Sequence, residues 1–359
     1  MKKETHKLVR VLIADDSSVG RRLLAGILSQ DPFIEVVAMA TDGKEALELT
    51  IKHKPDVVSM DINMPVMNGI EATRRIMSES PVPVIIVSSI YRNSDVLTAI
   101  SELEAGAVMV LPKPHGPGHE SFESSSAKYI NSVKLMSDVK VVRRQLNGNG
   151  TAKKITTNHL RIPHSETCKV NNNAKIVVIG SSAGGPEALR FFLTQISTEF
   201  PLPIILVQHI DSNFINGFVS WLNTFSNIRA FIAQNGEKPE RGKLYLPPPD
   251  SHIAIVNGTI TIMNGDNINS LHKPSVDILF KSVARYYLEN SVGIIFSGMG
   301  RDGADGLKMM KDSGAFTFIQ DNESSLIYGM PGEALKIGAA CAVLSPKEIA
   351  IKLNHIYSK

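Results

Sequence analysis

The stretch IVVIGSSAGGPEALR, Ile176–Arg190, passes from an apolar run through a glycine-rich turn into a helical pattern. A strand that leads by a tight turn into a helix is the repeating unit of parallel α/β folds. Small residues in such a turn make room for an exposed side chain, for a bound phosphate, or only for the turn itself. The rest of the sequence must decide whether Ser181 or Ser182 has a chemical role.

Two phosphate-binding motifs do not fit this turn. A Walker-type loop ends in Gly-Lys-Ser/Thr, whereas this one runs into Gly-Gly-Pro-Glu, and glycines at 180, 184 and 185 miss the G-x-G-x-x-G spacing. The turn does fit G-x-S-x-G, in which a serine stands on a sharp turn beside N–H groups that favour an oxyanion. This motif predicts Ser182 as a nucleophile. By itself, it is matched at least as often by a plain glycine-rich turn with a capping serine.

A serine nucleophile needs a base, and the base needs an acid that orients it. His209 directly follows the apolar run IILVQ, so we expect it at the same sheet edge as Ser182; taken alone, a histidine that caps the next loop is an equally good interpretation. The run IIFSGMGRDGADG carries Asp302 and Asp305 in a glycine-rich loop. Asp305 stands where a helix N-cap is expected, so Asp302 is predicted to be the orienting acid.

Strands and helices continue to alternate towards the C-terminus. Asn257-Gly258, between two alternating runs, predicts a β-hairpin. The predicted strands are Ile176–Ile179, Ile204–Gln208, Arg229–Ala233, Lys243–Leu246, Val292–Ser297 and Ala315–Gln320. The predicted helices are Pro186–Ile196, Ile215–Phe225, Val276–Leu288 and Pro346–Ile356. These elements predict a doubly wound, mainly parallel, Rossmann-like sheet with an antiparallel hairpin.

The first third of the chain shows the same alternation. Its predicted strands are Val9–Ala14, Ile34–Ala40, Val57–Met60, Val84–Val87 and Ala107–Leu111. Its predicted helices are Val19–Ser29, Lys44–Lys52, Gly69–Ser78, Asp95–Ala105 and Ser125–Leu146. Five strands that alternate with helices predict another parallel sheet. The predicted fold class is therefore α/β, with two doubly wound domains.

A change in composition separates the two domains. Asn147–Lys175 is rich in Asn, Gly, Thr and Lys and has no sustained period, as in a linker. We therefore predict a first domain at 1–146, a polar linker at 147–172 and a second domain at 173–359.

Composition excludes several classes of protein. A net charge of +3 over 359 residues argues against nucleic-acid binding. No window approaches the apolar length of a membrane helix, so we expect no direct membrane insertion. The two cysteines form no metal-binding pattern, and a disulfide framework is not expected in a chain this long. Together these features favour a cytoplasmic protein.

Polar side chains follow the predicted strands of the first domain. Asp15 and Asp16 follow the first strand, Asp61 follows the third, and the fourth and fifth are followed by Ser88 and Lys113. Because the carboxyl ends of parallel strands meet at one edge of a sheet, we expect these side chains to converge. Three carboxylates repel one another unless a cation joins them, and a hard ion such as Mg²⁺ suits oxygen ligands. A single strand-end aspartate would be better explained as a helix cap or turn residue.

This combination of DD, D, S and K-P at successive strand ends, within Val9–Leu146, resembles the receiver domain of two-component response regulators. The resemblance implies that Asp61 accepts a phosphoryl group from a histidine kinase, and that Ser88 and Lys113 contact that group. It also implies Mg²⁺ ligands at Asp15, Asp16, Asp61 and the backbone of Asn63. Receivers often carry an aromatic switch residue three positions before the lysine. Val110 stands there, so a switch through that residue is not expected.

Six segments together resemble the chemotaxis-type protein-glutamate methylesterases, namely IGSSAGGPEAL, ILVQHI, LPPPDSHI, HKPSVDILF, IFSGMGRDGADG and YGMPGEA. With the receiver and linker, the resemblance spans essentially the whole chain. It implies hydrolysis of glutamate methyl esters on methyl-accepting chemotaxis receptors, deamidation of certain receptor glutamines, and a role in sensory adaptation. No organic cofactor is implied for the esterase reaction.

The same resemblance assigns roles to residues. It implies a catalytic triad of Ser182, His209 and Asp302, and an oxyanion held by the backbone near Met299. The family often has a threonine after the nucleophile, and Ala183 stands at that position here, so a hydroxyl contribution is absent.

Two other interpretations remain open. The chain could be a phosphorylation-gated binding protein whose second domain docks a partner without catalysis, or a nucleotide-binding enzyme that uses the Gly180 loop. If it is an esterase, two domains joined by a polar linker predict that the unphosphorylated receiver covers the Ser182 crevice. With Val110 in place of an aromatic residue, we expect the switch to run through Ser88 and the loop around Tyr91.

Overall fold

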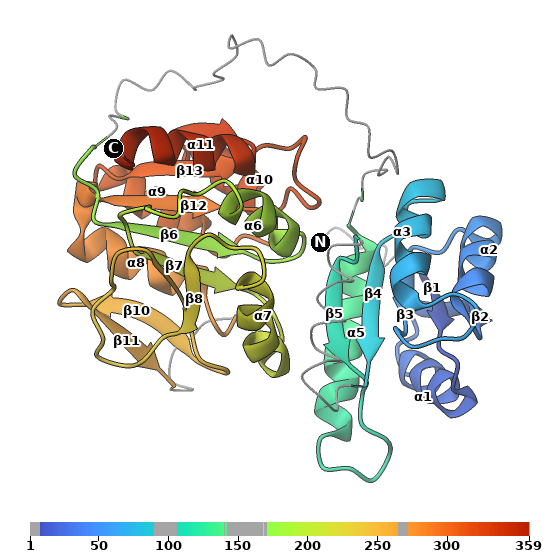
Figure 1. The fold of residues 1–359 in the computed structure, drawn as a ribbon. Coiled ribbons are helices and arrows are strands. Elements are labelled where there is room, and N and C mark those ends of the chain that lie inside the picture. The colour runs from blue at the N-terminus through green and yellow to red at the C-terminus, as the bar shows by residue number, and fades with distance from the viewer. Residues whose placement is uncertain are drawn as a thin grey trace, which may run out of the picture. The chain divides into compact units, whose positions relative to one another are not determined.

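The computed structural model describes residues 8–89, 106–139, 141, 168, 171–264 and 272–358. The chain divides into two compact units, Met1–Thr151 and Ala152–Lys359, and each is built on a parallel sheet packed with helices (Figure 1). The predicted α/β class with two doubly wound sheets is confirmed. The predicted linker lies outside the described residues except for 168, 171 and 172.

The first unit has a five-stranded sheet of order β2-β1-β3-β4-β5, in which all pairs are parallel. Its elements are β1 (Val9–Ala14), α1 (Ser18–Leu28), β2 (Ile34–Ala40), α2 (Gly43–His53), β3 (Val57–Met60), α3 (Gly69–Glu79), β4 (Val84–Ser88), β5 (Met109–Pro112) and α5 (Phe122–Ser137). The five predicted strands are confirmed within two residues. The predicted helix Asp95–Ala105 and the loop around Tyr91 lie outside the described residues, and α5 begins before the predicted Ser125.

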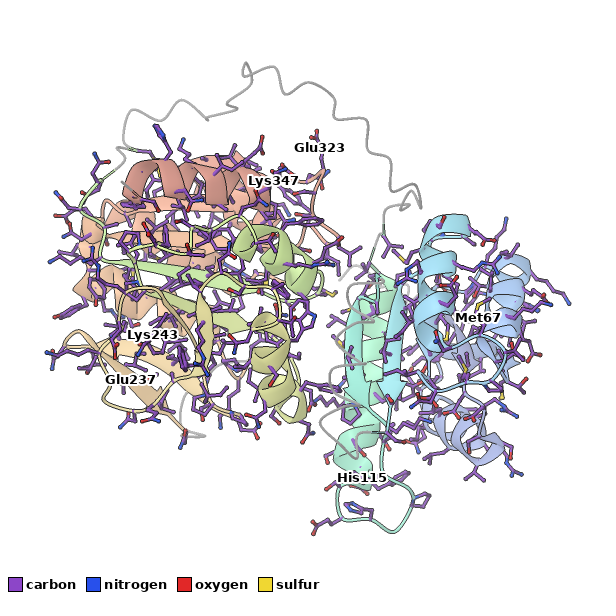
Figure 2. The ribbon with its side chains drawn as sticks, viewed as in Figure 1. Met67, His115, Glu237, Lys243, Glu323 and Lys347 are labelled. Carbon is purple, nitrogen blue, oxygen red and sulfur yellow. A yellow bond between two sulfur atoms is a disulfide. The ribbon has the colours of Figure 1, made fainter. Side chains whose placement is uncertain are left out.

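Local sequence explains where these helices begin. α1, α2 and α3 each follow a residue whose side chain accepts hydrogen bonds from N–H groups of the first turn, namely Ser17, Asp42 and Asn68. Such a cap stabilises a helix by about 1 kcal/mol. The carbonyl of Met67 accepts a hydrogen bond from the N–H of Gly43 at 2.9 Å, which ties the start of α2 to the loop after β3. Figure 2 labels Met67.

The second unit has a seven-stranded sheet of order β14-β13-β12-β6-β7-β9-β8, again with parallel pairs. Its strands are β6 (Ile176–Ser181), β7 (Ile204–Gln208), β8 (Arg229–Ile232), β9 (Lys243–Leu246), β12 (Ser291–Ile295), β13 (Phe316–Gln320) and β14 (Ala342–Leu344). Its helices are α6 (Gly185–Leu193), α7 (Ile215–Leu222), α8 (Val276–Tyr286), α9 (Ala304–Asp312), α10 (Met330–Lys336) and α11 (Pro346–Tyr357). Two short 3₁₀ turns lie at Ser212–Phe214 and Leu288–Asn290.

The core of the second unit lies around its central strands. Every residue of β6, β12 and β13 is buried, as expected for strands covered on both faces. α6 contacts α11, and α8 contacts both α9 and β6. A fully buried leucine or isoleucine stabilises the fold by about 2 kcal/mol, so these strands are a rigid platform for the loops that follow them.

The predicted hairpin is confirmed as a separate two-stranded antiparallel sheet, β10 (His252–Val256) and β11 (Thr259–Met263). Asn257 and Gly258 have φ angles of 50° and 78°. Left-handed conformations at both central residues are those of a type I′ turn, which suits the twist of a hairpin.

α10 and β14 were not predicted from the sequence. α10 begins within Gly329-Met330-Pro331-Gly332, where glycine and proline obscure a helical period, and β14 has only three residues. Both elements pack against the sheet, which supplies the stability that their local sequences lack.

The expectation about the cysteines was wrong in one respect. Cys168 and Cys341 are joined by a disulfide, with a Cα–Cα distance of 5.7 Å. Their separation of 173 residues leaves no local sequence signal for the pairing. The bond attaches the end of the predicted linker to buried Cys341, next to β14.

Candidate active site

The strand order of the second sheet reverses at β6. β7, β9 and β8 lie on one side of it, and β12, β13 and β14 lie on the other. Ser182 follows β6, His209 follows β7, and Asp302 lies in the loop between β12 and α9. Loops that follow the strands at such a switch point line a crevice, so the fold brings the three predicted residues to one sheet edge.

Ser181 and Ser182 have different surroundings. Ser181 is fully buried at the end of β6, and its hydroxyl donates a hydrogen bond to Gln208 Oε1 at 2.6 Å. Ser182 is partly exposed, and its backbone N–H donates to the carbonyl of Ser297 at 3.0 Å. Of the two serines, Ser182 is therefore the one that a substrate can reach.

Close backbone packing explains the glycines around Ser182. Gly184 has a φ of +78°, and a Cβ there would lie 2.5 Å from Ser297 Oγ. A Cβ on Gly298 would lie 2.9 Å from the Cβ of Ser182. The loop after β12 thus lies directly against the nucleophile turn, and glycine is required on both sides of the contact.

The carboxylate of Asp302 is held by the N-terminus of α8. Its Oδ1 accepts hydrogen bonds from Ser275 Oγ at 2.9 Å and the Asp277 N–H at 3.0 Å. Its Oδ2 accepts from the Val276 N–H at 2.7 Å and lies 2.9 Å from His209 Nε2. This carboxylate is therefore fixed in position by one helix end and by the histidine.

These contacts also fix the charge of Asp302. Burial alone would raise the pKa of its carboxyl group, but the hydrogen bond and charge of His209, with the N–H groups of Val276 and Asp277, outweigh burial and hold the pKa well below its usual range. An ionised carboxylate only accepts hydrogen bonds, so Nε2 of His209 carries a proton in either state of the ring, and in the neutral state the lone pair lies on Nδ1.

Among the described residues, no hydrogen bond joins the side chains of Ser182 and His209; the two segments are joined through the backbone, by His209 N–H to the Ser181 carbonyl at 2.9 Å. Hydrogen bonds of a catalytic serine are often long without substrate, so this geometry is compatible with a triad.

Three polar residues beside the triad were missed in the sequence. Ser275 caps α8 and contacts Asp302; His252 Nδ1 accepts from the Ser275 N–H at 3.2 Å; and the His272 ring stacks on His209 with centroids 4.6 Å apart. Burial lowers the pKa of both His252 and His272. Ser275 could have been found, because a serine before a helical run is a cap signal.

The structure distinguishes Asp305 from Asp302. Asp305 is about half exposed and pairs with Arg301 at 2.8 Å. The expectation that it caps the helix was wrong, because Gly303 occupies the N-cap of α9 with a φ of 90°. Asp305 therefore has neither the burial nor the contacts of an orienting acid.

Met299 lies in the loop after β12, next to Gly298, which packs on Ser182. Within the described ranges, neither its N–H group nor that of Ala183 donates a hydrogen bond to another backbone group. Both groups are therefore available as donors to a developing oxyanion.

The acidic residues of the first unit converge as predicted. Carboxylate oxygens of Asp15, Asp16 and Asp61 lie within 4.8 Å of one another. Lys113 Nζ lies 2.7 Å from an oxygen of Asp15 and 2.7 Å from one of Asp61. These three carboxylates offer only oxygen ligands, and such a cluster fits a hard cation such as Mg²⁺.

The ionised carboxylates of this cluster are destabilised by burial and by their mutual repulsion. Burial raises the pKa of Asp61 and the charge of Asp15 adds to the rise, while Lys113 offsets them only in part. Burial would lower the pKa of Lys113, but its hydrogen bonds to Asp15 and Asp61 raise the pKa instead. A divalent cation would relieve the repulsion between the carboxylates.

The remaining predicted residues of the first unit lie around this cluster. Ser88 is buried at the end of β4, and Asn63 is exposed, two positions after Asp61. Val110 is buried in β5. In the loop after Lys113, the rings of His115, labelled in Figure 2, and His119 stack with centroids 3.8 Å apart.

No described helix combines the length and apolar character needed to cross a membrane.

Comparison with known proteins identifies a family for each of the two units. Residues 177–353 match the family described as CheB methylesterase, and residues 11–119 match the response regulator receiver domain. A protein-glutamate methylesterase/protein-glutamine glutaminase of Nitrosospira multiformis is 42% identical, over 98% of both chains. One from Geobacter metallireducens is 43% identical, over 97% of this chain and 99% of its own. The crystal structure of the Thermotoga maritima CheB methylesterase catalytic domain is 33% identical, covers 51% of this chain and 98% of its own, and has a TM-score of 0.48.

Proposed function

Because the chain belongs to the protein-glutamate methylesterase/protein-glutamine glutaminase family, we propose that it hydrolyses glutamate methyl esters, and deamidates glutamines, on methyl-accepting chemotaxis receptors. The observation that supports this most is the carboxylate of Asp302, fixed by the end of α8 and bonded to His209 Nε2, beside the turn that carries Ser182. A buried acid, a histidine and an accessible serine are the parts of a serine hydrolase.

The first chemical step follows from the tautomer of His209. With its proton on Nε2 facing Asp302, the ring accepts the Ser182 hydroxyl proton at Nδ1 as Oγ attacks the ester carbonyl. The N–H groups of Met299 and Ala183 are proposed to hold the oxyanion.

Collapse of the tetrahedral intermediate completes the reaction. The C–O bond to methanol breaks, and His209 returns its proton to the leaving oxygen. Water, deprotonated by the same ring, then hydrolyses the acyl-enzyme and restores a glutamate carboxylate on the receptor. Deamidation differs only in that ammonia leaves. No cofactor is required for these steps.

We propose that the receiver controls this reaction. Asp61 would accept a phosphoryl group from a histidine kinase, and Lys113 and Ser88 would contact its oxygens. Mg²⁺ would be held by Asp15, Asp16, Asp61 and the carbonyl of Asn63, and when bound it supplies positive charge that offsets the incoming phosphoryl group. In this proposal the protein acts in the cytoplasm, because its two proposed partners, the kinase and the cytoplasmic part of the receptor, are found there.

The deciding experiment measures methanol release from a methylated receptor. Ser182→Ala should reduce turnover by on the order of 10³-fold or more, because the covalent step is lost. Ser220→Ala, the same substitution at an exposed position of α7, is the control and should retain full activity. Near-wild-type turnover by Ser182→Ala would leave the second unit as a binding module rather than an esterase.

A further inference from the structure

Gln208, the last residue of β7, is almost fully buried next to the nucleophile turn. Its Oε1 accepts the hydrogen bond from Ser181 Oγ at 2.6 Å. Its Nε2 donates to the carbonyl of Ser182 at 2.8 Å and to the carbonyl of His209 at 3.0 Å. One side chain thus binds the backbone of the predicted nucleophile and that of the predicted base.

The chemistry of these partners allows only one orientation of the amide. Two carbonyl oxygens can accept hydrogen bonds only from the NH₂ end of Gln208, so Oε1 must face Ser181. The hydroxyl of Ser181 must then be the donor. Both N–H bonds of the amide are used, and no substitution among the common residues reproduces all three hydrogen bonds.

The Ser181–Gln208 pair packs closely against Gly185. A Cβ on Gly185 would lie 2.3 Å from Gln208 Oε1 and 2.8 Å from the Cβ of Ser181. Position 185 therefore requires glycine, because the Ser181–Gln208 pair fills the space that a side chain would take. The backbone bond from His209 N–H to the Ser181 carbonyl closes the connection.

We propose that Gln208 and Ser181 form a positioning pair that sets the distance between Ser182 and His209. The inference rests on the proposed function, in which Ser182 is the nucleophile. No direct side-chain bond holds Ser182 to His209 among the described residues, so the separation of the two groups depends on the backbone segments that Gln208 joins. A displacement of about 1 Å between reacting groups lowers a rate by on the order of 10²-fold.

The test uses the full-length protein and three variants of the pair. Gln208→Met keeps the volume and removes all three hydrogen bonds, Ser181→Ala removes one, and Gln208→Glu replaces the NH₂ donors by a carboxylate. Thr317→Val is the matched control, because Thr317 is buried in β13 and its hydroxyl bonds to the Ala339 carbonyl at 2.6 Å, away from the triad. Thermal unfolding reports folding of each variant.

Two activities are measured: kcat and KM on methylated receptor, and the rate at which a fluorophosphonate labels Ser182. Gln208→Met should lower kcat and labelling by about 10- to 100-fold with KM changed less than about threefold, and Ser181→Ala should lower them by about 3- to 10-fold. Thr317→Val should match wild type per folded molecule. The activity of Gln208→Glu relative to wild type should rise as the pH falls, because only a protonated carboxyl group can donate to one of the two carbonyls.

A folded Gln208→Met with kcat and labelling within about twofold of wild type would overturn the inference, as would an equal loss in Thr317→Val. If Gln208→Met does not fold, Ser181→Ala decides, and unchanged labelling of that folded variant overturns the pair. A wild-type protein whose Ser182 is not labelled contradicts the proposed nucleophile itself, which separates the failure of the proposed function from the failure of this inference.

Discussion

Asp302 and Asp61 are both partly or fully buried carboxylates at the carboxyl ends of parallel strands, yet their pKa values move in opposite directions. Asp302 receives hydrogen bonds from Ser275 and from two N–H groups of α8, and it faces His209. Asp61 receives one N–H bond, from Ile62 at 2.8 Å, and one bond from Lys113, which it shares with Asp15. Two carboxylates at equivalent positions of similar sheets therefore have pKa values shifted in opposite directions.

The difference lies in the neighbouring charges. The donors around Asp302 satisfy its oxygens and stabilise the ionised form, which suits a group that must orient a histidine without changing its own state. Asp61 shares its pocket with Asp15 and Asp16, so its ionised form is strained until a cation arrives. In the proposed function, Asp302 stays ionised and orients His209, whereas Asp61 binds a metal ion and accepts a phosphoryl group.

The largest expected effect separates the two carboxylates by activity. Asp302→Asn should lower esterase turnover by on the order of 10⁴-fold, because an amide favours the wrong tautomer of His209. Asp61→Asn, assayed without a phosphodonor, should stay within about twofold of wild type. Asp305→Asn is the control, and its effect should be mild because the side chain of Asp305 is about half exposed and pairs with Arg301 at the surface. Steady-state methanol release measures all three, and a severe Asp305 defect would reassign the acid.

Phosphorylation tests the role proposed for Asp61. Asp61 should take up phosphate from a small-molecule donor only when a divalent cation is present, and a chelator should slow uptake at least about tenfold, because the added charge must be offset beside Asp15 and Asp16. Radiolabel incorporation measures the uptake. Phosphate found on Asp61→Asn, or uptake that ignores the chelator, would contradict this assignment of the site.

Removing the receiver tests whether one site controls the other. Deletion of Met1–Asn147 should raise basal esterase activity above that of the unphosphorylated full-length protein, by on the order of fivefold or more, a common size for coupling between sites. Phosphorylation of the full-length protein should raise it as well. If the truncated and demonstrably folded chain is slower than the full-length one, occlusion is wrong and the receiver activates through a positive contact.

The smallest expected effect concerns stability. The pKa of Asp302 is lowered on folding, so its ionisation stabilises the protein above the unfolded pKa of about 3.9, and this stability is lost as the pH falls further through the folded pKa. The pKa of Asp61 is raised on folding, so its ionisation destabilises the protein above the same pH. At pH 7 without divalent cations, Asp302→Asn should therefore lower the free energy of unfolding by about 1–3 kcal/mol, and Asp61→Asn should raise it by about 1 kcal/mol.

Urea unfolding at pH 7 and below pH 4 measures both differences, which should shrink at the acid pH. Mg²⁺ should reduce the advantage of Asp61→Asn, because a bound ion stabilises the wild-type receiver. If both substitutions change the free energy of unfolding in the same direction at pH 7, the two carboxylates do not have opposite effects on stability.

Much of the fold could be predicted because apolar periodicity and turn residues are properties of neighbouring positions. The strands Val9–Ala14, Ile34–Ala40, Ile204–Gln208 and Lys243–Leu246 were predicted to the residue. Segments that depend on packing were not: α10 contains glycine and proline, and β14 is three residues long. Their helical and extended conformations are stabilised by the sheet they contact.

For the sites, the sequence by itself determined which residue types stand at which strand ends. Ser182, His209 and Asp61 each lie in a turn that follows an apolar run, and such a run is visible in the sequence. Only the tertiary structure decided what each of these groups contacts. His209 and Asp302 are 93 residues apart, and Gln208 and Ser181 are 27 apart. Such contacts depend on the order of the strands and on the packing of α8, which no local pattern of the chain specifies. The pKa of a carboxylate depends on those contacts. The fold therefore stabilises the ionised form of Asp302 and destabilises that of Asp61.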